Sequence, residues 1–347
     1  MVSEAAAVST APSRPAPSRR PGAGVLGVAA LLAVAVVAPF LLSDYHTLQL
    51  TKVVFYAIAI LGLNLLTGFT GQISLGNGAF WALGSYVAVI LLTKAGIPYW
   101  ALPPLSGAVC FVVGYLFGRT ATRLEGLYLA LATFALAIVT PQLLKHDKLE
   151  AWTGGSQGIA FAKPSSPLPG QLSDDQWLYF FCVIVAVLLF VVAWNIVRGR
   201  TGRAFIALRD HPIAAGTMGI DTATYKAIAF GLSAMYTGVA GALDALAAGF
   251  IGPDSFSALL SIQLLTGGVL GGIFSIFGTL FGAAFVNLVP DMAKQLSDAA
   301  PAVLYGILLI VCMMVMPGGM AGLVRSVRAW LVRALAGNHR NRPRNRT

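Results

Sequence analysis

The chain has 347 residues, of which 57% are hydrophobic and only 10% are charged, and its formal net charge is +10. A soluble domain carries about a quarter of charged residues, so this composition excludes an ordinary soluble protein and predicts an all-α polytopic membrane protein. Most of the positive charge lies in two tails, residues 1–23 with three Arg against one Glu and residues 325–346 with seven Arg and no acid. This distribution indicates cytoplasmic termini near anionic lipid headgroups and argues against a nucleic-acid partner.

The first 23 residues, rich in Ala, Ser and Pro, are predicted to form a disordered cytoplasmic N-terminal tail. The apolar stretch that follows, 24–42, could be a cleaved signal peptide or a first membrane span. We favour the uncleaved span because its apolar core is longer than the apolar region of a typical signal peptide.

Apolar stretches long enough to cross a bilayer, roughly 17 to 25 residues each, recur along the chain and predict a bundle of about eight to ten transmembrane helices over residues 24–320. Segment 259–297 is Gly-rich and fits either two spans or a re-entrant hairpin, and 302–317 is a short last span. A basic cytoplasmic C-terminal tail is predicted over 321–347. The other predicted spans are 24–42, 50–68, 79–96, 99–118, 124–144, 176–197 and 226–249.

Two Gly-rich segments, 67–86 and 264–285, interrupt the plain hydrophobic helices, and both follow or contain a Leu-Leu-Thr-Gly sequence, at 65–68 and 264–267. At membrane depth, loosened backbone is tolerated where it is packed in protein or lines a water-filled cavity, and paired Gly-interrupted segments are typical of a transport pathway. Close helix packing through small residues is the alternative interpretation. The candidate pathway residues in these segments are Thr67, Thr70, Gln72, Ser74, Asn77 and Thr266.

Segment 145–175 has nearly balanced charges together with Pro and Gly, and we expect an external, irregular loop there. The three cysteines, Cys110, Cys182 and Cys312, all fall inside predicted spans. This position indicates neither a disulfide framework nor a zinc site, and no metal or cofactor is expected.

Segment 198–226 is the one long charged interruption of the apolar chain. Its basic residues outnumber its two acids, which places it on the cytoplasmic face by the positive-inside rule. The segment is long enough for one or two short helices along the membrane surface, so we expect it to dock a soluble partner. The charged residues are Arg198, Arg200, Arg203, Arg209 and Lys226 against Asp210 and Asp221.

Asp244 is a carboxylate inside predicted span 226–249, near its external end. An ionisable residue within a span is by default a functional hypothesis, and Asp244 joins the candidate pathway residues. The alternative is that its side chain simply reaches the headgroup region.

Four runs stand out over about residues 50–320: GLNLLTGFTGQISLGNGAFWALGSY, TGGSQGI at 153–159, RTGRAFIALRDHPIAAGTMGID and SIQLLTGGVLGGIFSIFGTLFGAAF. Together they resemble the LivM-type permeases of branched-chain amino acid ABC importers. Related urea and short-chain amide permeases share most of these motifs, so the resemblance indicates the transporter class more firmly than the solute.

The resemblance implies a bacterial inner-membrane subunit that forms the pathway for a small solute by ATP-driven alternating access. It implies four partners: a LivH-like permease, two ATP-binding cassette subunits and an extracytoplasmic substrate-binding protein. The chain has no G-x-x-x-x-G-K-[ST] phosphate loop, which agrees with a transport subunit that is not itself an enzyme.

The resemblance also places a coupling helix for the ATPase over Arg203 to Gly219. Small residues there, Ala214, Ala215 and Gly219, would let the helix enter a groove on the ATPase, and Arg209 and Asp210 could pair across the interface.

The family usually has an apolar or aromatic residue where Asp244 stands, so this position departs from the pattern.

The remaining alternatives are a urea or amide permease, a stand-alone secondary transporter or channel, and an intramembrane enzyme. An ion-coupled carrier would be expected to hold more buried carboxylates than Asp244, a channel needs no large docking loop, and for an enzyme the histidines form no metal-ligand cluster.

Overall fold

The computed structural model describes residues 33, 35–40, 43–121, 124, 126–166, 173–294, 306, 310 and 314. The chain divides into two units between Leu41 and Leu42. In the first unit, residues 33 and 35–40 are helical. The predicted spans 24–42 and 302–317 lie largely outside the described residues, as do both tails, and the account below concerns the second unit.

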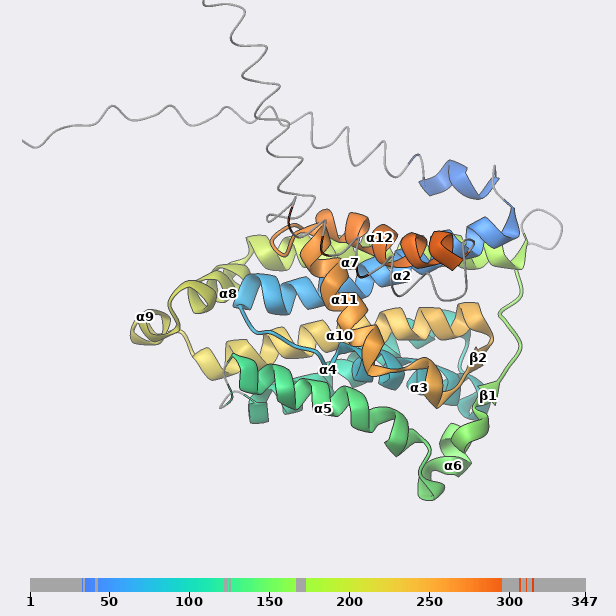
Figure 1. The fold of residues 1–347 in the computed structure, drawn as a ribbon, viewed down its shortest axis with the longest axis horizontal. Coiled ribbons are helices and arrows are strands. Elements are labelled where there is room, and N and C mark those ends of the chain that lie inside the picture. The colour runs from blue at the N-terminus through green and yellow to red at the C-terminus, as the bar shows by residue number, and fades with distance from the viewer. Residues whose placement is uncertain are drawn as a thin grey trace, which may run out of the picture. The chain divides into compact units, whose positions relative to one another are not determined.

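Within the described residues, six helices are long and apolar enough to cross a membrane (Figure 1). They confirm six of the predicted spans and the all-α polytopic class. The helices are α2 (Asp44–Leu63, continued to Gly68), α3 (Asn77–Ala95), α4 (Leu102–Ala121, preceded by the turn η2, Tyr99–Ala101), α5 (Leu127–Leu144), α7 (Asp174–Arg198) and α10 (Thr222–Ala248).

Helix α10 lies at the centre and packs against α4, α3 and α2. Small residues permit this close approach: a Cβ added at Gly84 of α3 would clash with the backbone of Gly238 of α10. The face of α4 that meets α10 is likewise lined by Gly107, Gly114 and Gly118. Without a hydrophobic driving force between helices in lipid, such backbone contact supplies much of the packing energy. Close packing through small residues, one of the two interpretations of the Gly-rich sequence, therefore describes these helix contacts.

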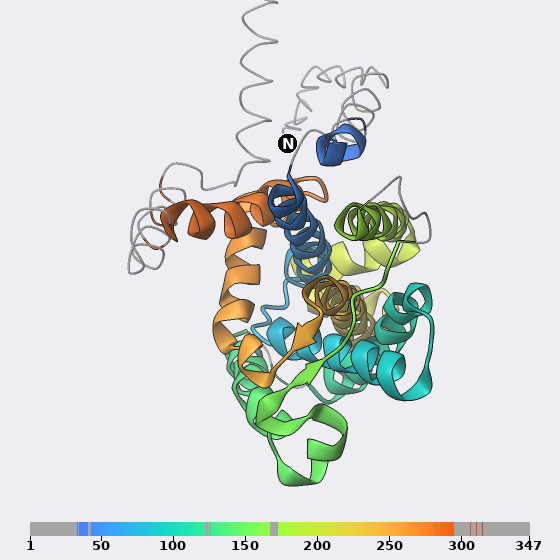
Figure 2. The same ribbon diagram turned by 90° about the vertical axis from the view of Figure 1, so that its right-hand side faces the viewer.

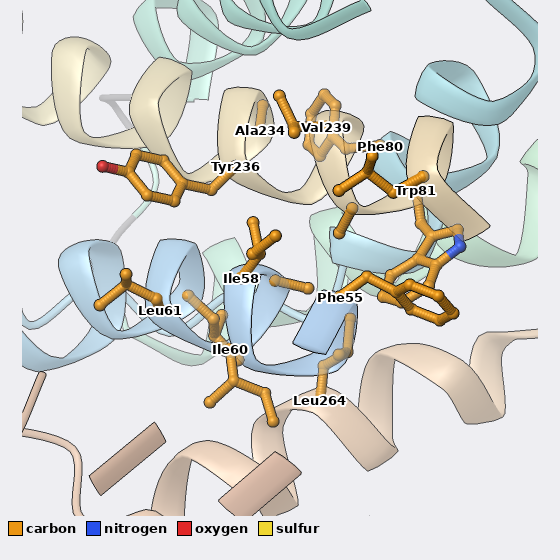
Figure 3. Close-up of a cluster of buried hydrophobic side chains, with 14 of the residues drawn as sticks. Phe55, Ile58, Ile60, Leu61, Phe80, Trp81, Ala234, Tyr236, Val239 and Leu264 are labelled. Atoms are coloured by element: carbon orange, nitrogen blue, oxygen red, sulfur yellow. The ribbon is translucent and has the colours of Figure 1, made fainter. Parts of the chain in front are cut away.

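A core of large side chains fills the space between α2 and α10 (Figure 3). Phe55, Ile58 and Leu61 of α2 lie beneath Tyr236 of α10 and Trp81 of α3, all almost fully buried. The hydroxyl of Tyr236 donates to the carbonyl oxygen of Leu189 at 2.8 Å, so the buried phenol is satisfied. This bond ties α7 to the centre of the bundle.

Segment 259–297 forms two helices, α11 (Ala258–Gly271) and α12 (Gly278–Lys294). With 14 residues, α11 is shorter than the roughly 20 residues that a perpendicular span requires, and α12 is helical up to Lys294, where the described part of this segment ends. They cross at a steep angle in both views (Figures 1 and 2) and meet through the glycine pair Gly271 and Gly278. The segment therefore forms two helices joined by a glycine-rich turn, and the choice between two spans and a re-entrant hairpin stays a prediction.

The bundle has two different ends. One, the α8–α9 end, carries the short helices α8 (Arg200–Asp210) and α9 (Pro212–Thr217). The other, the β1–β2 end, carries α6 (Asp147–Thr153), the turns η3 (Gly155–Gln157) and η4 (Pro253–Ser255), and the strands β1 (Ile159–Ala160) and β2 (Phe250–Ile251) (Figure 1). The strands pair antiparallel, with Ile159 opposite Ile251.

The expectation of an irregular loop over 145–175 is therefore wrong for the part that contains α6 and β1. The TGGSQGI run organises it: the Thr153 hydroxyl donates to the carbonyl oxygens of Leu144 and Leu149, and Gly154 takes a φ of +73° to end α6.

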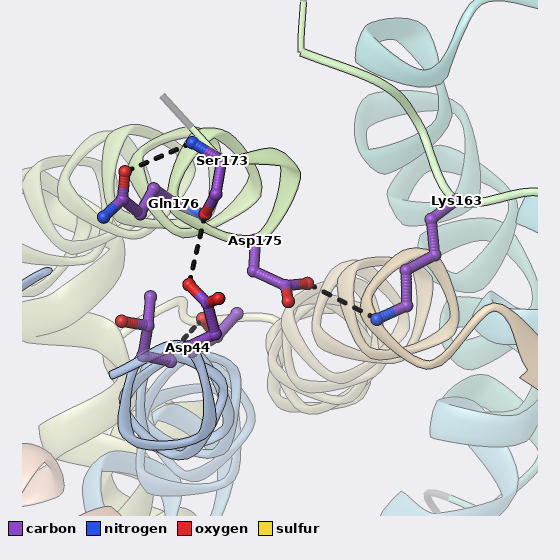
Figure 4. A network of polar contacts seen from close by, with 7 residues as sticks. Asp44, Lys163, Ser173, Asp175 and Gln176 are labelled. Carbon is purple, nitrogen blue, oxygen red and sulfur yellow. Dashed lines mark hydrogen bonds and ion pairs between the residues drawn. The ribbon is translucent and has the colours of Figure 1, made fainter. Parts of the chain in front are cut away.

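A polar network fixes the first turn of α7 at the β1–β2 end (Figure 4). Ser173 and Gln176 form a capping box, in which each side chain accepts the other residue's backbone N–H. The Ser173 hydroxyl also donates to Asp44 at 3.3 Å, which joins the starts of α7 and α2. Lys163 and Asp175 form an ion pair of 3.4 Å whose partners are partly exposed, so it contributes little by comparison.

Candidate functional site

The first Gly-rich segment breaks the α2–α3 connection inside the bundle. From Asn64 to Gly68 the helix widens to a π-turn, η1, and residues 71–76 then run in irregular backbone until α3 begins at Asn77. Single π-turns occur frequently at functional sites. Gly71 has a φ of +73°, a conformation that other residues rarely adopt, and it turns the chain back into the bundle.

Three of the predicted pathway residues form one network around this turn. The Thr70 hydroxyl donates to the carbonyl oxygen of Leu66 at 2.6 Å. Gln72 donates to the Thr70 hydroxyl at 2.9 Å, and the Thr67 hydroxyl donates to the carbonyl oxygen of Gln72 at 3.1 Å. The polar side chains therefore support the broken backbone directly.

Asn77, at the start of α3, ties the segment to α10. Its amide donates to the hydroxyls of Ser233 and Thr237 at 3.2 and 3.1 Å, and the Ser74 hydroxyl lies 3.3 Å from its oxygen. Asn77 is 2% exposed, so these bonds lie in protein rather than in lipid. A satisfied buried network of this kind makes the segment rigid.

Two backbone N–H groups of the segment are also satisfied by side chains. Leu75 donates to the hydroxyl of Thr133 on α5 at 2.9 Å, and Gly78 donates to the hydroxyl of Ser261 on α11 at 2.8 Å. Sequence reasoning missed these partners because a single Ser or Thr in an apolar helix usually bonds its own helix and gives no other signal.

The second Gly-rich segment lies against the first. The Asn64 amide donates to the carbonyl oxygen of Ser275 at 3.4 Å, and a Cβ at Gly68 would clash with the carbonyl oxygen of Ile273. Thr266, a predicted pathway residue, is buried and donates to Ile262 of its own helix at 2.8 Å. The two segments are thus neighbours, although Thr266 itself supports α11.

A cavity of about 260 Å³ opens beside this contact, at the α8–α9 end. Half of its lining residues are aromatic, and the lining carries one cation, Arg198, whose guanidinium lies 3.9 Å from the centre of the Trp194 ring. The lining residues are Phe69, Trp194, Val197, Arg198, Phe274, Ser275, Ile276 and Phe277. No group of three His, Cys, Asp or Glu that could hold a metal ion occurs among the residues that the structure describes.

Arg209, the last basic residue of α8, connects segment 198–226, the predicted docking loop, to both broken segments. Its guanidinium lies 4.7 Å from the centre of the Phe274 ring, and its aliphatic chain packs beside Gly71. Arg209 also forms an ion pair of 2.8 Å with Asp210. The two residues therefore pair with each other in this chain, and their pairing across an interface stays a prediction.

The predicted coupling residues of α9 divide into exposed and buried ones. Ala215 is only 5% exposed, so it offers little surface to a partner in this structure, and the expectation that it enters a groove on the ATPase stays a prediction. Gly219 has a φ of +86° and ends α9, with the N–H of Ile220 bonded to the carbonyl oxygen of Ala215. Ala214 and, on α8, Arg203 are exposed.

Two prominently exposed residues, one in α9 and one directly after it, were missed by sequence reasoning. Ile213 is 85% exposed and Met218 is 84% exposed. Their signal in the sequence was the presence of large apolar residues in a charged loop, of which Phe205 and Leu208 are buried in the structure whereas Ile213 and Met218 are not. An apolar surface at this position is typical of a site that docks another protein.

Asp221 caps the N-terminus of α10 at the same end. Its carboxylate accepts from the hydroxyl of Thr224 at 2.5 Å and from the N–H of Thr224 at 3.2 Å. These bonds hold the pKa of Asp221 below its usual value. Because the pKa is lowered, the cap is complete at neutral pH and is lost only as the pH falls through that lowered pKa.

Asp244 lies apart from this network, four residues before the end of α10 at the β1–β2 end. The indole N–H of Trp81 donates to its Oδ2 atom at 3.1 Å. The structure therefore brings Thr67, Thr70, Gln72, Ser74 and Asn77 together but places Asp244 in a second position along the bundle.

Comparison with known proteins agrees with this arrangement. Residues 47–316 match a family described as the permease component of the branched-chain amino acid transport system. The chain is 32% identical to the high-affinity branched-chain amino acid transport system permease protein LivM of Salmonella typhimurium, over 85% of this chain and 74% of that protein. It is 31% identical to LivM of Escherichia coli, over 86% and 75%.

A second permease protein of the same kind, LivH of Escherichia coli, is 25% identical over 77% of this chain and 91% of its own. No solved structure matches the chain. The family match covers most of the chain, including both broken segments and the docking loop. The chain therefore belongs to the family of branched-chain amino acid transport system permease components, which are multi-pass membrane transport subunits and not enzymes.

Proposed function

We propose that this chain is one of two permease subunits of an ATP-driven importer that carries branched-chain amino acids across a bacterial inner membrane. Its partners are a LivH-like permease, two ATP-binding cassette subunits and an extracytoplasmic binding protein. The names of the LivM and LivH relatives support the solute and the second permease. The α8–α9 end and both termini face the cytoplasm in this proposal, as the positive-inside rule predicts.

The observation that carries the mechanism is the position of Arg209. Its side chain contacts Gly71 of the first broken segment and Phe274 of the second, so a displacement of α8 reaches both. Closure of the ATPases would move α8 and α9 and thereby change the packing between the two segments. Packed interfaces have discrete arrangements rather than continuous ones, so such a shift can switch the pathway between outward and inward access.

The exposed apolar side chains of α5 and α7 fit the membrane setting. Leu127 and Tyr128 of α5 and Ile184 and Leu188 of α7 are at least 60% exposed. In the assembled transporter, these faces meet lipid or the second permease. We expect no nucleic-acid partner for this chain.

The purified chain should hydrolyse no ATP, and uptake should require all partners. We expect proteoliposomes that contain the complete assembly to move radiolabelled leucine across the membrane only under two conditions. ATP must be present on the α8–α9 side of the membrane, and loaded binding protein must be present on the opposite side. Urea and acetamide, the solutes of the alternative permease type, should not be accumulated. ATP hydrolysis by the isolated chain, or leucine uptake without ATP as for a stand-alone secondary transporter, would contradict the proposal.

The orientation can be tested with single cysteines in a background that lacks the native ones. A cysteine at the exposed Ser165, at the β1–β2 end, should react with an impermeant maleimide added to intact cells. A cysteine at the exposed Thr217 of α9 should react only after the membrane is opened. Labelling of Thr217→Cys in intact cells would reverse the proposed orientation.

A further inference from the structure

The cavity of about 260 Å³ at the α8–α9 end has no role in the polar network of the first broken segment. Its walls come from three separate parts of the bundle. They are Phe69 just after the π-turn η1, the last turns of α7 from Trp194 to Arg198, and residues 274–277 between α11 and α12. The cavity therefore joins both broken segments to the end of a membrane span.

The lining carries one positive charge and no negative one. Arg198 lies over the Trp194 ring at 3.9 Å, and that ring in turn lies 5.7 Å from the ring of Phe277. A guanidinium over an aromatic face keeps its N–H donors in its own plane, where they can bind an anion in a fork. Arg198 is exposed and takes part in none of the three ion pairs of the described residues. Its fork of donors is therefore open to a ligand.

The cavity lies at the level of the lipid headgroups. Arg198 is the last residue of the 25-residue span α7, and Trp and Arg at the ends of spans lie in the headgroup region. An apolar surface adjoins it: Phe274 and Phe277 of the lining are 57% and 42% exposed, and Phe281 on α12 is 51% exposed. The site thus offers a cation beside exposed aromatic rings.

We propose that this cavity binds an anionic glycerophospholipid, whose phosphate pairs with Arg198. Pockets that enclose a drug-sized ligand measure about 300 to 1,000 Å³, so the cavity takes only the head and glycerol, and the acyl chains lie along the exposed phenylalanines. The absence of an acid from the lining disfavours a free amino acid, whose ammonium would be buried without a partner. In a zwitterionic lipid, the headgroup's own cation competes with Arg198 for the phosphate.

A bound lipid would brace the two broken segments, because Phe69 and residues 274–277 both touch it. This inference goes beyond the proposed function and holds whichever solute the chain carries.

The first test removes the charge. Native mass spectrometry of the full-length, detergent-purified chain should show phosphatidylglycerol bound at least about 10-fold more tightly than phosphatidylcholine, as one charge-assisted contact provides. Arg198→Gln should abolish this preference. Arg200→Gln is the matched control: it removes an exposed charge that does not line the cavity, and it should keep the preference. An equal loss in both variants would reveal unspecific surface attraction and overturn the site.

The second test fills the cavity and leaves the charge in place. Val197→Trp puts a large ring into the lining, whereas Val191→Trp puts the same ring on a 54% exposed position of α7 outside the lining. We expect only Val197→Trp to lose the preference for phosphatidylglycerol, with thermal unfolding in phosphatidylcholine as the check that both variants are folded. A folded Val197→Trp variant with the wild-type preference would overturn the site. If Val197→Trp does not fold, Arg198→Gln decides.

The third test identifies the source of the anion. Phosphatidylglycerol should raise the unfolding temperature of the wild-type chain but not of Arg198→Gln, and neither inorganic phosphate nor leucine should do so. A rise with inorganic phosphate as large as that with the lipid would make this a site for a free anion. A rise with leucine that Arg198→Gln abolishes would make it a site for the solute. Either result would overturn the lipid site and leave the proposed function standing.

Discussion

Replacement of Ile213 by glutamate is expected to abolish leucine uptake while the protein remains in the membrane. Ile213 is 85% exposed on α9, so the substitution leaves the fold of the chain unchanged. In the assembled importer, its side chain would lie against the ATP-binding subunit, where a carboxylate would be buried without a partner. Burial of an unpaired charge costs roughly several kcal/mol, which is enough to prevent association. The measurement is uptake together with co-purification of the ATPase.

Two further variants serve as controls for Ile213→Glu. Ile213→Leu keeps the apolar surface and should behave as wild type. Arg200→Gln removes an exposed charge from the start of α8 and should do little, because exposed ion pairs are worth about 0 to 1 kcal/mol. Normal uptake and co-purification of Ile213→Glu would show that α9 is a solvated connector. Ala215→Glu is a less informative variant, since Ala215 is buried in its own chain and the change would disturb α9 itself.

Replacement of Gly68 by alanine is expected to separate the two broken segments. A Cβ at Gly68 would occupy the position of the Ile273 carbonyl oxygen, which is backbone and cannot rotate away. Overpacking typically costs about 1 to 3 kcal/mol, and a clash with backbone should fall at the upper end of that range. We expect a clear decrease in the thermal unfolding temperature of the detergent-purified protein, together with loss of uptake.

Gly216→Ala is the matched control for this substitution. A Cβ at Gly216 would meet nothing closer than a methyl group of Thr222 at 3.8 Å, and Gly216 lies in a helix with a negative φ. Alanine is the better helix former, so this variant should unfold at or slightly above the wild-type temperature. Equal unfolding temperatures for both variants would mean that the contact between Gly68 and Ile273 does not hold the segments together.

The spans were predictable from the sequence, whereas the contacts between them were not. Long apolar runs such as 176–197 need no knowledge of tertiary structure, because length and hydropathy alone decide membrane insertion. The Gly-rich segments were also visible as breaks. Their contact through Asn64 and Ser275 joins residues 211 positions apart, and no local pattern records such a pairing.

The docking loop was likewise predictable as an element, whereas the contacts of its side chains were not. Its charge predicted a surface segment with short helices, which the structure confirms. The sequence could not show which side of α9 is exposed, because a helix of 6 residues has too few positions to display a period. The small residues therefore looked like the exposed surface, whereas Ile213 and Met218 are the large side chains that are exposed there.

The hydrogen bonds of the broken first segment also constrain how the protein is made. The N–H groups of Leu75 and Gly78 are satisfied by hydroxyls that lie 58 and 183 residues further along the chain. An unsatisfied polar group in the bilayer core costs several kcal/mol, so this segment cannot settle when α2 and α3 first leave the ribosome. It must stay hydrated or loosely placed until α5 and then α11 have been inserted. Biogenesis of the protein therefore ends, rather than begins, with the ordering of its most irregular segment.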